Sequence, residues 1–149
     1  MSQVLSTRLA DETAERLKRF ARRLGKTPSE TGAMLIEESL RETEFAHIEF
    51  RNSSVGRQPY LKGSGLAVWE VLMVAKSYRM DCEKVAAHFR KPLEWVKAAF
   101  NYADAYPEEI RLAIEDYEET TPTTLQRMFP ELQILTVPKE VLEEDREKR

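Results

Sequence analysis

A short strand pattern followed directly by two helical segments is the feature that most limits how this chain can fold. Residues 3–9 alternate with the period of a half-buried strand, in which one side carries Leu5, Thr7 and Leu9 and the other carries Val4, Ser6 and Arg8. One strand and two helices within about 45 residues neither close a sheet nor bury a core. Pairing with the same strand of a second copy solves both problems and presents Ser6 and Arg8 outward. Because a two-stranded ribbon fits the major groove of B-DNA, the pattern predicts a dimeric DNA-binding arm.

The two helices of this arm have clear start and stop signals. Residues 11–24 carry an apolar stripe at helical spacing, and Gly25 follows as a stop. Thr27 can cap a second helix, Pro28 suits its first turn, and Glu30 can complete a capping box. The apolar and small positions of this second helix predict its core face, which consists of Gly32, Leu35, Ile36, Ser39 and Leu40.

Taken together, these signals resemble a known fold. The matching residues are Val4-Leu5-Ser6-Thr7-Arg8-Leu9, Glu15-Arg16-Leu17, Gly25 and Thr27-Pro28-Ser29-Glu30, which resemble the ribbon-helix-helix fold of the Arc/MetJ/CopG repressors. The resemblance implies two intertwined chains whose paired strands read the major groove. By position, Val4, Ser6 and Arg8 would read bases, and the start of the second helix at Lys26, Thr27 and Ser29 would hold a backbone phosphate.

Two positions of the arm depart from that family. Val4 stands where a polar residue is usual, and Thr7 stands where an aliphatic residue is usual. A plainer interpretation also stays open, in which the exposed Ser6 and Arg8 are a solvated face and the arm serves only for dimerisation.

The charge of the chain is patterned along its length. Its 149 residues carry a net charge of −3, which taken alone argues against DNA binding. Residues 1–26 and 51–100 carry net charges of +4 and +5, whereas residues 27–50 and 101–149 carry −5 and −7. Two basic blocks therefore alternate with two acidic ones, and this charge asymmetry is informative where the total charge is not.

The sequence also indicates a compartment. The single cysteine, Cys82, excludes an internal disulfide, which favours the cytoplasm. No apolar run approaches the roughly 20 residues of a membrane span, and Met1 to Ala10 lacks the apolar core of a signal peptide.

A central module is expected over residues 46–119. Residues 47–51 predict a short strand, Asn52-Ser53-Ser54 has turn chemistry, and residues 56–66 predict a small hairpin with a glycine-bearing turn. Four helical segments follow: the first is lined by Val68, Val71, Leu72 and Ala75, the second is capped by Asp81, and Pro92 and Pro107 open the third and fourth.

The second and third of these helices form a helix-turn-helix candidate, because a short helix, a tight turn and a longer helix follow one another. Lys97 and Asn101 lie one turn apart off the apolar face, with Arg90 and Lys91 just ahead, so these four residues are candidate DNA contacts. They are equally consistent with the polar surface of any small helical domain.

A second resemblance covers about residues 48–115. The residues that carry it are Gly56-Arg57-Gln58-Pro59, Gly63-Ser64, Val68-Trp69, Val85-Ala86 and Tyr102-Ala103. They resemble a small helix-turn-helix family that is catalogued as a domain of unknown function and found in VapB-type antitoxins. The resemblance implies DNA binding or dimerisation. Gly65 and Ala67 stand where that family has Arg and Pro.

The tail, residues 120–149, begins where Pro122 breaks the fourth helix. We expect its apolar residues to pack on the chain's own core, and the alternative is that they dock on another protein. The candidate partner-binding residues are Leu125, Met128, Phe129, Leu132, Ile134, Leu135 and Val137.

The residues that could support catalysis are few. His47 and His88 are the only histidines and lie far apart in the sequence, and Gly63-Ser64-Gly65 lacks the lysine of a phosphate-binding loop. No nucleophile, base and orienting group can be assembled, so we expect neither an enzyme nor a cofactor or metal site.

These interpretations predict a mainly α protein: a ribbon-helix-helix arm that forms an intertwined dimer (residues 1–45), a small helix-turn-helix domain with a short β-hairpin, and a tail. The resemblances imply a DNA-binding transcriptional regulator, the antitoxin of a type II toxin–antitoxin pair that neutralises a PIN-domain ribonuclease toxin and represses its own operon. The alternatives are a dimeric protein-interaction adaptor and a metabolic repressor with a small-molecule pocket.

Overall fold

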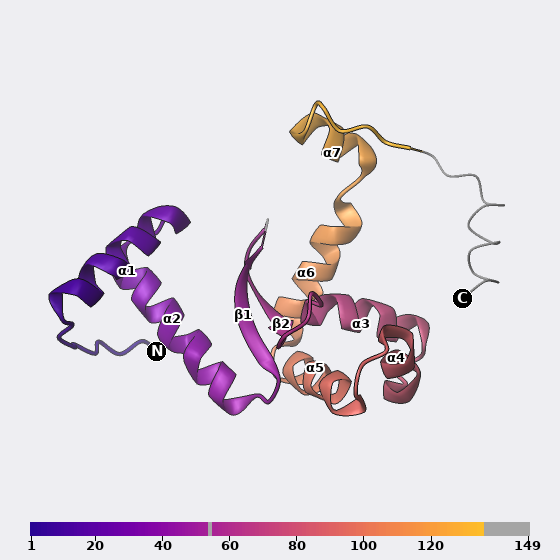
Figure 1. Ribbon diagram of the computed structural model, residues 1–149, viewed down its shortest axis with the longest axis horizontal. Helices are drawn as coiled ribbons and strands as arrows, with labels where there is room; N and C mark the ends of the chain where they lie inside the picture. Colours follow the sequence, from indigo (N-terminus) through magenta and orange to yellow (C-terminus); the bar gives the residue numbers. More distant parts are fainter. Residues whose placement is uncertain (54, 136–149) are drawn as a thin grey trace.

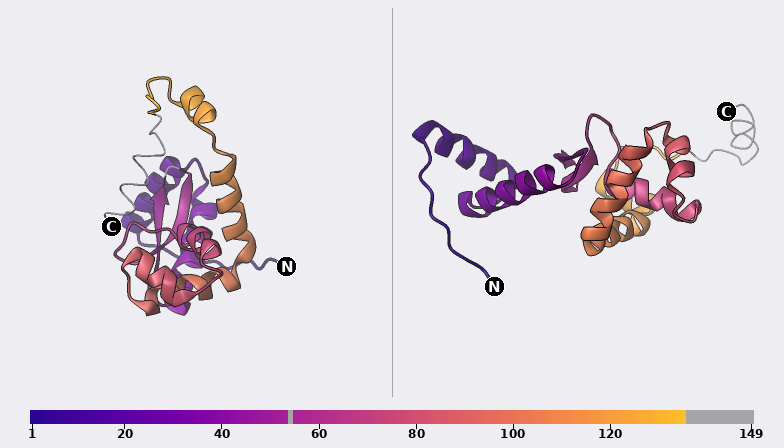
Figure 2. Two further views of the ribbon diagram at one scale, coloured as in Figure 1. Left: turned by 90° about the vertical axis from the view of Figure 1, so that its right-hand side faces the viewer. Right: turned by 90° about the horizontal axis from the view of Figure 1, so that it is seen from below.

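The structure of this protein is a computed structural model, which describes residues 1–53 and 55–135. The described chain is mainly helical with one two-stranded sheet, as the sequence predicts. Helices α1 (Asp11–Leu24) and α2 (Pro28–Glu44) form an arm that projects from the rest of the chain. Figure 2 shows the arm at one end of an elongated molecule, with the sheet between the arm and the remaining helices.

The local signals of the arm are confirmed. α1 ends at Gly25, whose φ of 65° is the left-handed conformation that ends a helix without steric cost. α2 begins with the expected capping box, in which the Thr27 hydroxyl accepts a hydrogen bond from the Glu30 amide and the Glu30 carboxylate accepts one from the Thr27 amide.

The strand expected at residues 3–9 is not formed in the single chain. Residues 1–10 form neither helix nor strand, and all of them are exposed. Among residues 1–53 and 55–135 the only strand ladder joins β1 and β2, so the N-terminal segment has no partner within its own chain. A strand needs a neighbour for its backbone hydrogen bonds, and within residues 1–53 and 55–135 this segment has none.

The hairpin pairs different residues from those expected. Strand β1 (Ile48–Ser53) pairs antiparallel with β2 (Gly56–Leu61), whereas the sequence predicted a hairpin within residues 56–66. The glycine-bearing turn exists, with Gly63 at φ 72°, but only a single bridge between Tyr60 and Ala67 follows it. This ladder accommodates Pro59, which lacks an N–H group, because Pro59 lies opposite Phe50, whose own N–H points away from β2 to Glu42.

The four helices of the central module lie where the sequence predicts them. They are α3 (Val68–Ser77), α4 (Cys82–Phe89), α5 (Leu93–Ala105) and α6 (Pro107–Glu119). Asp81 caps α4 by accepting hydrogen bonds from the amides of Glu83 and Lys84. Together with the hairpin, these helices enclose one core, whose fully buried side chains include Leu61, Val68, Val71, Val85, Val96 and Tyr102.

The tail leaves the module as helix α7 (Pro122–Met128), which confirms the expected helical turns. The prediction that the tail packs on its own chain is wrong for the residues that the structure describes. Leu125 is half-buried, whereas the other described apolar side chains, Met128, Phe129, Leu132, Ile134 and Leu135, are exposed. Val137 lies outside the described residues.

Candidate nucleic-acid interface

The three candidate base-reading residues are all accessible. Val4 is 98% exposed, and Ser6 and Arg8 are exposed as well. Residues 1–10 leave the outer end of α1 and project away from the arm helices and the module (Figure 2), so the module does not cover these side chains. Their accessibility is a necessary condition for reading a groove.

The start of α2 has fewer free hydrogen-bond donors for a phosphate than its sequence implies. The capping box engages the amide and hydroxyl of Thr27, and the amide of Lys26 donates to the Ala21 carbonyl. The hydrogen bond from the Thr27 amide is the main reason that the pKa of Glu30 is lowered, so this position carries a negative charge at neutral pH. A phosphate here would therefore depend on the Lys26 ammonium and the Ser29 amide.

The turn between α4 and α5 holds Arg90 and Lys91. Arg90 ends α4 in the left-handed conformation with φ 54°, and its side chain is exposed. The Lys91 ammonium lies 5.5 Å from the centre of the Trp95 ring, a cation–π distance, and the Trp95 ring lies 5.7 Å from that of His47. Lys91 is thus held against α5 while Arg90 is free to face solvent.

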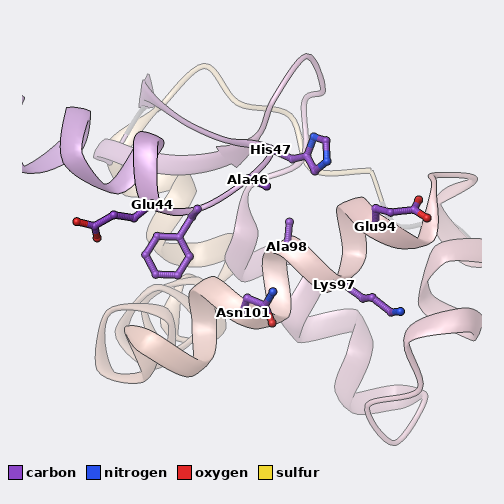
Figure 3. Close-up of a pocket in the computed structure, with 8 residues that line it drawn as sticks. Glu44, Ala46, His47, Glu94, Lys97, Ala98 and Asn101 are labelled. Carbon is purple, nitrogen blue, oxygen red and sulfur yellow. The ribbon is translucent and has the colours of Figure 1, made fainter.

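Lys97 and Asn101 lie together on α5, beside a hollow of about 530 Å³ between α5 and the end of the arm (Figure 3). The small side chains of Ala46 and Ala98 leave this space open. The hollow is lined by Glu44, Phe45, Ala46, His47, Glu94, Lys97, Ala98 and Asn101. Because two carboxylates share it with one lysine, this face of α5 is not strongly positive, which weakens the case for a phosphate contact here.

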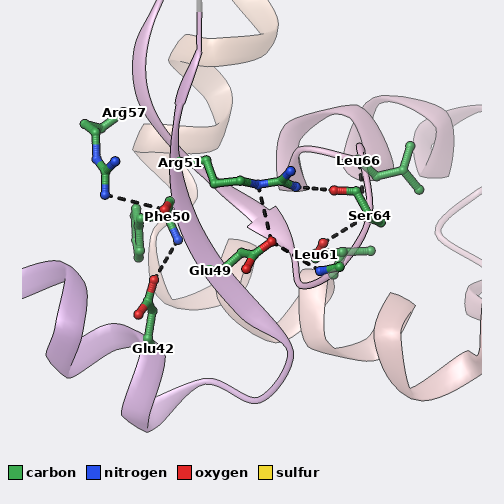
Figure 4. A network of polar contacts seen from close by, with 9 residues as sticks. Glu42, Glu49, Phe50, Arg51, Arg57, Leu61, Ser64 and Leu66 are labelled. Carbon is green, nitrogen blue, oxygen red and sulfur yellow. Dashed lines mark hydrogen bonds and ion pairs between the residues drawn. The ribbon is translucent and has the colours of Figure 1, made fainter.

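Two arginines that the sequence did not single out connect the arm to the module. Arg57 on β2 donates to both carboxylate oxygens of Glu38 on α2, at 3.0 and 2.7 Å. Its guanidinium also reaches the Phe50 carbonyl, and Phe50 donates its amide to Glu42 of α2 at 2.8 Å (Figure 4). The hydrogen bonds to Glu38 raise the pKa of Arg57, so the guanidinium keeps its charge.

Arg41 of α2 makes the second connection. It donates to the Tyr102 hydroxyl and to Glu109, both at 2.8 Å, and to Glu37 of its own helix at 2.9 Å. Its guanidinium also lies 3.7 Å above the centre of the Tyr106 ring. Burial opposes the charged form of Arg41, but the hydrogen bonds to Glu37, Tyr102 and Glu109 outweigh it and raise the pKa.

Sequence reasoning missed Arg41 and Arg57 because their partners are distant along the chain. Arg41 and Glu109 are 68 residues apart, and Arg57 and Glu38 are 19 apart. The one available signal was the Gly56-Arg57-Gln58-Pro59 motif, which marks Arg57 without indicating its partner.

Within residues 1–53 and 55–135, no group of three or more His, Cys, Asp or Glu side chains is placed to hold a metal ion. No helix of the described chain is both long enough and apolar enough to span a membrane. Comparison of the sequence and structure with family models, curated proteins and solved structures finds no match.

Proposed function

We propose that this protein is a dimeric DNA-binding transcriptional regulator that reads DNA through a ribbon built from two N-terminal segments. The observation that carries the proposal is that the arm leaves apolar side chains exposed in the single chain. Leu5 and Leu9 of the N-terminal segment and Ile36 and Leu40 of α2 are 85%, 46%, 55% and 52% exposed. Apolar side chains gathered in one small unit indicate a missing partner surface.

A second copy of the arm is the partner that fits this surface. An antiparallel pairing of residues 3–9 satisfies their backbone groups, and the inward side chains of the ribbon then cover the apolar face of α2. Ser6 and Arg8 point away from that face into solvent. A ribbon of this width fits the major groove, where arginine donates two hydrogen bonds to guanine.

Charge supports nucleic acid as the ligand of the arm. Residues 1–26 carry a net charge of +4 within a chain whose net charge is −3. Basic side chains concentrated beside the ribbon favour contact with phosphates and speed association with DNA.

The central module adds a helix-turn-helix unit. Helix α4, the turn at residues 90–92 and helix α5 have the order and lengths of that motif. Arg90 and Lys91 in the turn are its best DNA-contacting candidates, since Lys97 and Asn101 share their hollow with two glutamates.

The exposed tail supports an antitoxin role. Met128, Phe129 and Leu135 are 64%, 57% and 82% exposed, which suits a segment that lies in a groove of another protein. The resemblance of the module to VapB-type antitoxins makes a PIN-domain ribonuclease toxin the proposed partner, with repression of the shared operon as the cellular role.

The DNA-reading proposal is tested with Arg8→Ala. Binding to DNA from the protein's own promoter region should weaken by about 1–3 kcal/mol, with sequence preference lost at one base pair of each half-site. Fluorescence anisotropy at several salt concentrations measures both quantities. Arg111→Ala is the matched control, because Arg111 lies on α6 and, among the described residues, pairs only with Glu108 and Glu115 of its own helix. Equal operator affinity for Arg8→Ala and wild type would refute base reading by the ribbon.

A second candidate function, a dimeric adaptor that grips a partner through its tail, is favoured by the same exposed side chains. Salt separates the two functions: DNA binding should weaken steeply as salt rises, whereas an apolar tail interface should change little. The tail is tested by truncation at Thr121. If the truncated chain still neutralises the toxin, the tail does not bind it.

A further inference from the structure

Helix α2 has two different faces. One face carries Ile36 and Leu40, which the single chain leaves exposed. Another carries Glu38, Arg41 and Glu42, whose side chains all bond to residues after the arm. The helix proposed to pair with a second copy is therefore also the helix to which the module is attached.

The attachment is made of partly buried ion pairs. The side chains of Arg57 and Glu38 are 20% and 9% exposed, and that of Arg41 is 18% exposed. Their bonds join α2 to three other elements: β2 through Arg57, α5 through Tyr102 and α6 through Glu109. Glu38 and Arg41 are thus two separate anchor points on α2, and two anchor points restrict its rotation against the module more than one would.

The peptide that links the arm to the module is short and packed. Only residues 45–47 separate α2 from β1. The Phe45 ring lies 5.4 Å from the Tyr102 ring and 5.8 Å from the Tyr106 ring, and Ile48 is buried. Phe45 therefore packs against the core while Ala46 and His47 are exposed, and a linker of this length leaves little slack for independent movement.

We infer that Arg41 and Arg57 are positioning residues that hold the module in one orientation on the arm. The two modules of a dimer are then held at one separation. The consequence for DNA, which rests on the proposed function, is that the operator needs a defined spacing between the ribbon site and any flanking sites that the modules contact. The orientation itself does not depend on DNA binding.

Distances between spin labels test the inference without DNA. Glu12→Cys on α1 and Glu118→Cys on α6 place labels at exposed sites in a Cys82→Ser background. Labelled full-length chain is mixed with excess unlabelled chain, so that each dimer carries one labelled copy. A single narrow distance distribution is expected. A broad distribution in this parent protein would overturn the inference.

The decisive comparison is with an unlocked variant, Arg41→Met with Arg57→Gln and Glu38→Gln. Changing both members of the Arg57 pair avoids an unpaired charge, and circular dichroism checks that the helices remain. Loss of the narrow peak with helices retained is expected, whereas Arg111→Ala should keep the peak. An unchanged narrow peak in the unlocked variant would overturn the inference.

If the unlocked variant does not fold, Arg41→Lys and Arg57→Lys are the alternative. Lysine keeps the charge but cannot make the two-point contact with Glu38 or join Tyr102 to Glu109 in the same way. Broadening of the distance distribution with lysine supports positioning by the guanidinium groups, and an unchanged width contradicts it. Failure of Arg8→Ala to alter DNA binding would refute the proposed function and leave this result untouched.

Discussion

The arm and the central module are built mainly of amphipathic helices, yet only the module encloses a core. The module fully buries large side chains such as Leu61, Val71 and Tyr102, whereas within the two helices of the arm only Ala21, Thr31 and Glu38 are buried. Ile36 and Leu40 remain more than half exposed in the arm. Two helices packed on each other leave part of each apolar stripe in contact with water. Four helices and a hairpin together are enough to cover their apolar side chains on all sides.

This difference assigns different roles to similar sequence patterns. An apolar stripe that meets other elements of the same chain stabilises the monomer, and one that meets none is available to another molecule. The following predictions test whether the stability of the module is internal and that of the arm is intermolecular.

The largest effect is expected for Leu61→Ala in β2. Leu61 is fully buried in the core, so removing its side chain should lower the free energy of unfolding by about 2–5 kcal/mol. Urea denaturation followed by circular dichroism measures the change. Because this core belongs to one chain, the loss should be the same at low and high protein concentration. A loss that grows on dilution would show that the module too depends on a second copy.

The arm is tested with Ile36→Asp combined with Leu40→Asp. Placing charges on the uncovered face of α2 should cost roughly 2–4 kcal/mol of association free energy, with loss of the dimer. Sedimentation equilibrium measures the association. Leu112→Asp is the matched control, because Leu112 is an exposed apolar residue on α6 and not on the arm. A dimer that survives the double substitution would place the interface elsewhere.

The Arg41–Tyr102–Glu109 contact predicts a pH dependence. Burial, and then the Glu109 charge, raise the pKa of Tyr102 in the folded chain, whereas in the unfolded chain it ionises near its ordinary value of about 10. The contribution of neutral Tyr102 to the free energy of unfolding is therefore fully present below a pH of about 10. Above that pH the free energy of unfolding falls by about 1.4 kcal/mol per pH unit.

Comparison with Tyr102→Phe isolates this effect. The variant should be less stable at neutral pH, because it loses the hydroxyl that bonds Arg41 and Glu109, but its stability should fall less steeply above pH of about 10. Urea denaturation at a series of pH values measures the two slopes. Parallel curves for the wild type and the variant would contradict the burial of a neutral Tyr102.

The smallest effect concerns helix ends. The arm ends α1 with Gly25, whereas the module ends α3 with Arg79 and Met80 in succession at φ 52° and 62°. Left-handed backbone is unfavourable for residues with a side chain, so Arg79→Gly should stabilise the protein by about 0.5–1 kcal/mol. Thermal denaturation measures the shift, and Gly25→Ala should move stability the other way. A destabilised Arg79→Gly would show that the arginine side chain makes a compensating contact.

Local structure could be predicted well because its signals are local. Gly25, the Thr27–Glu30 capping box, Asp81 and Pro107 act on residues within about four positions, and each begins or ends a helix where the sequence indicates. The N-terminal contacts and the tail residues stay predictions, since their proposed partners are other molecules.

The wrong predictions concern which segments pair or pack together, which signals between near neighbours do not specify. The sequence favoured a hairpin within residues 56–66, but Gly56–Leu61 pairs with Ile48–Ser53, in a register that tolerates the missing N–H group of Pro59. The tail was expected to cover the core, yet its apolar side chains from Met128 to Leu135 are exposed. The module already closes its core without them.

The sequence by itself determined where the helices of this protein begin and end, since caps, prolines and glycines act through bonds between near neighbours. It also determined which faces are apolar, because the spacing of apolar residues follows the helical period. Only the tertiary structure decided which apolar faces are covered and that Arg41 and Arg57 join the arm to the module. Those outcomes depend on contacts between residues far apart in the chain, which a local pattern does not specify.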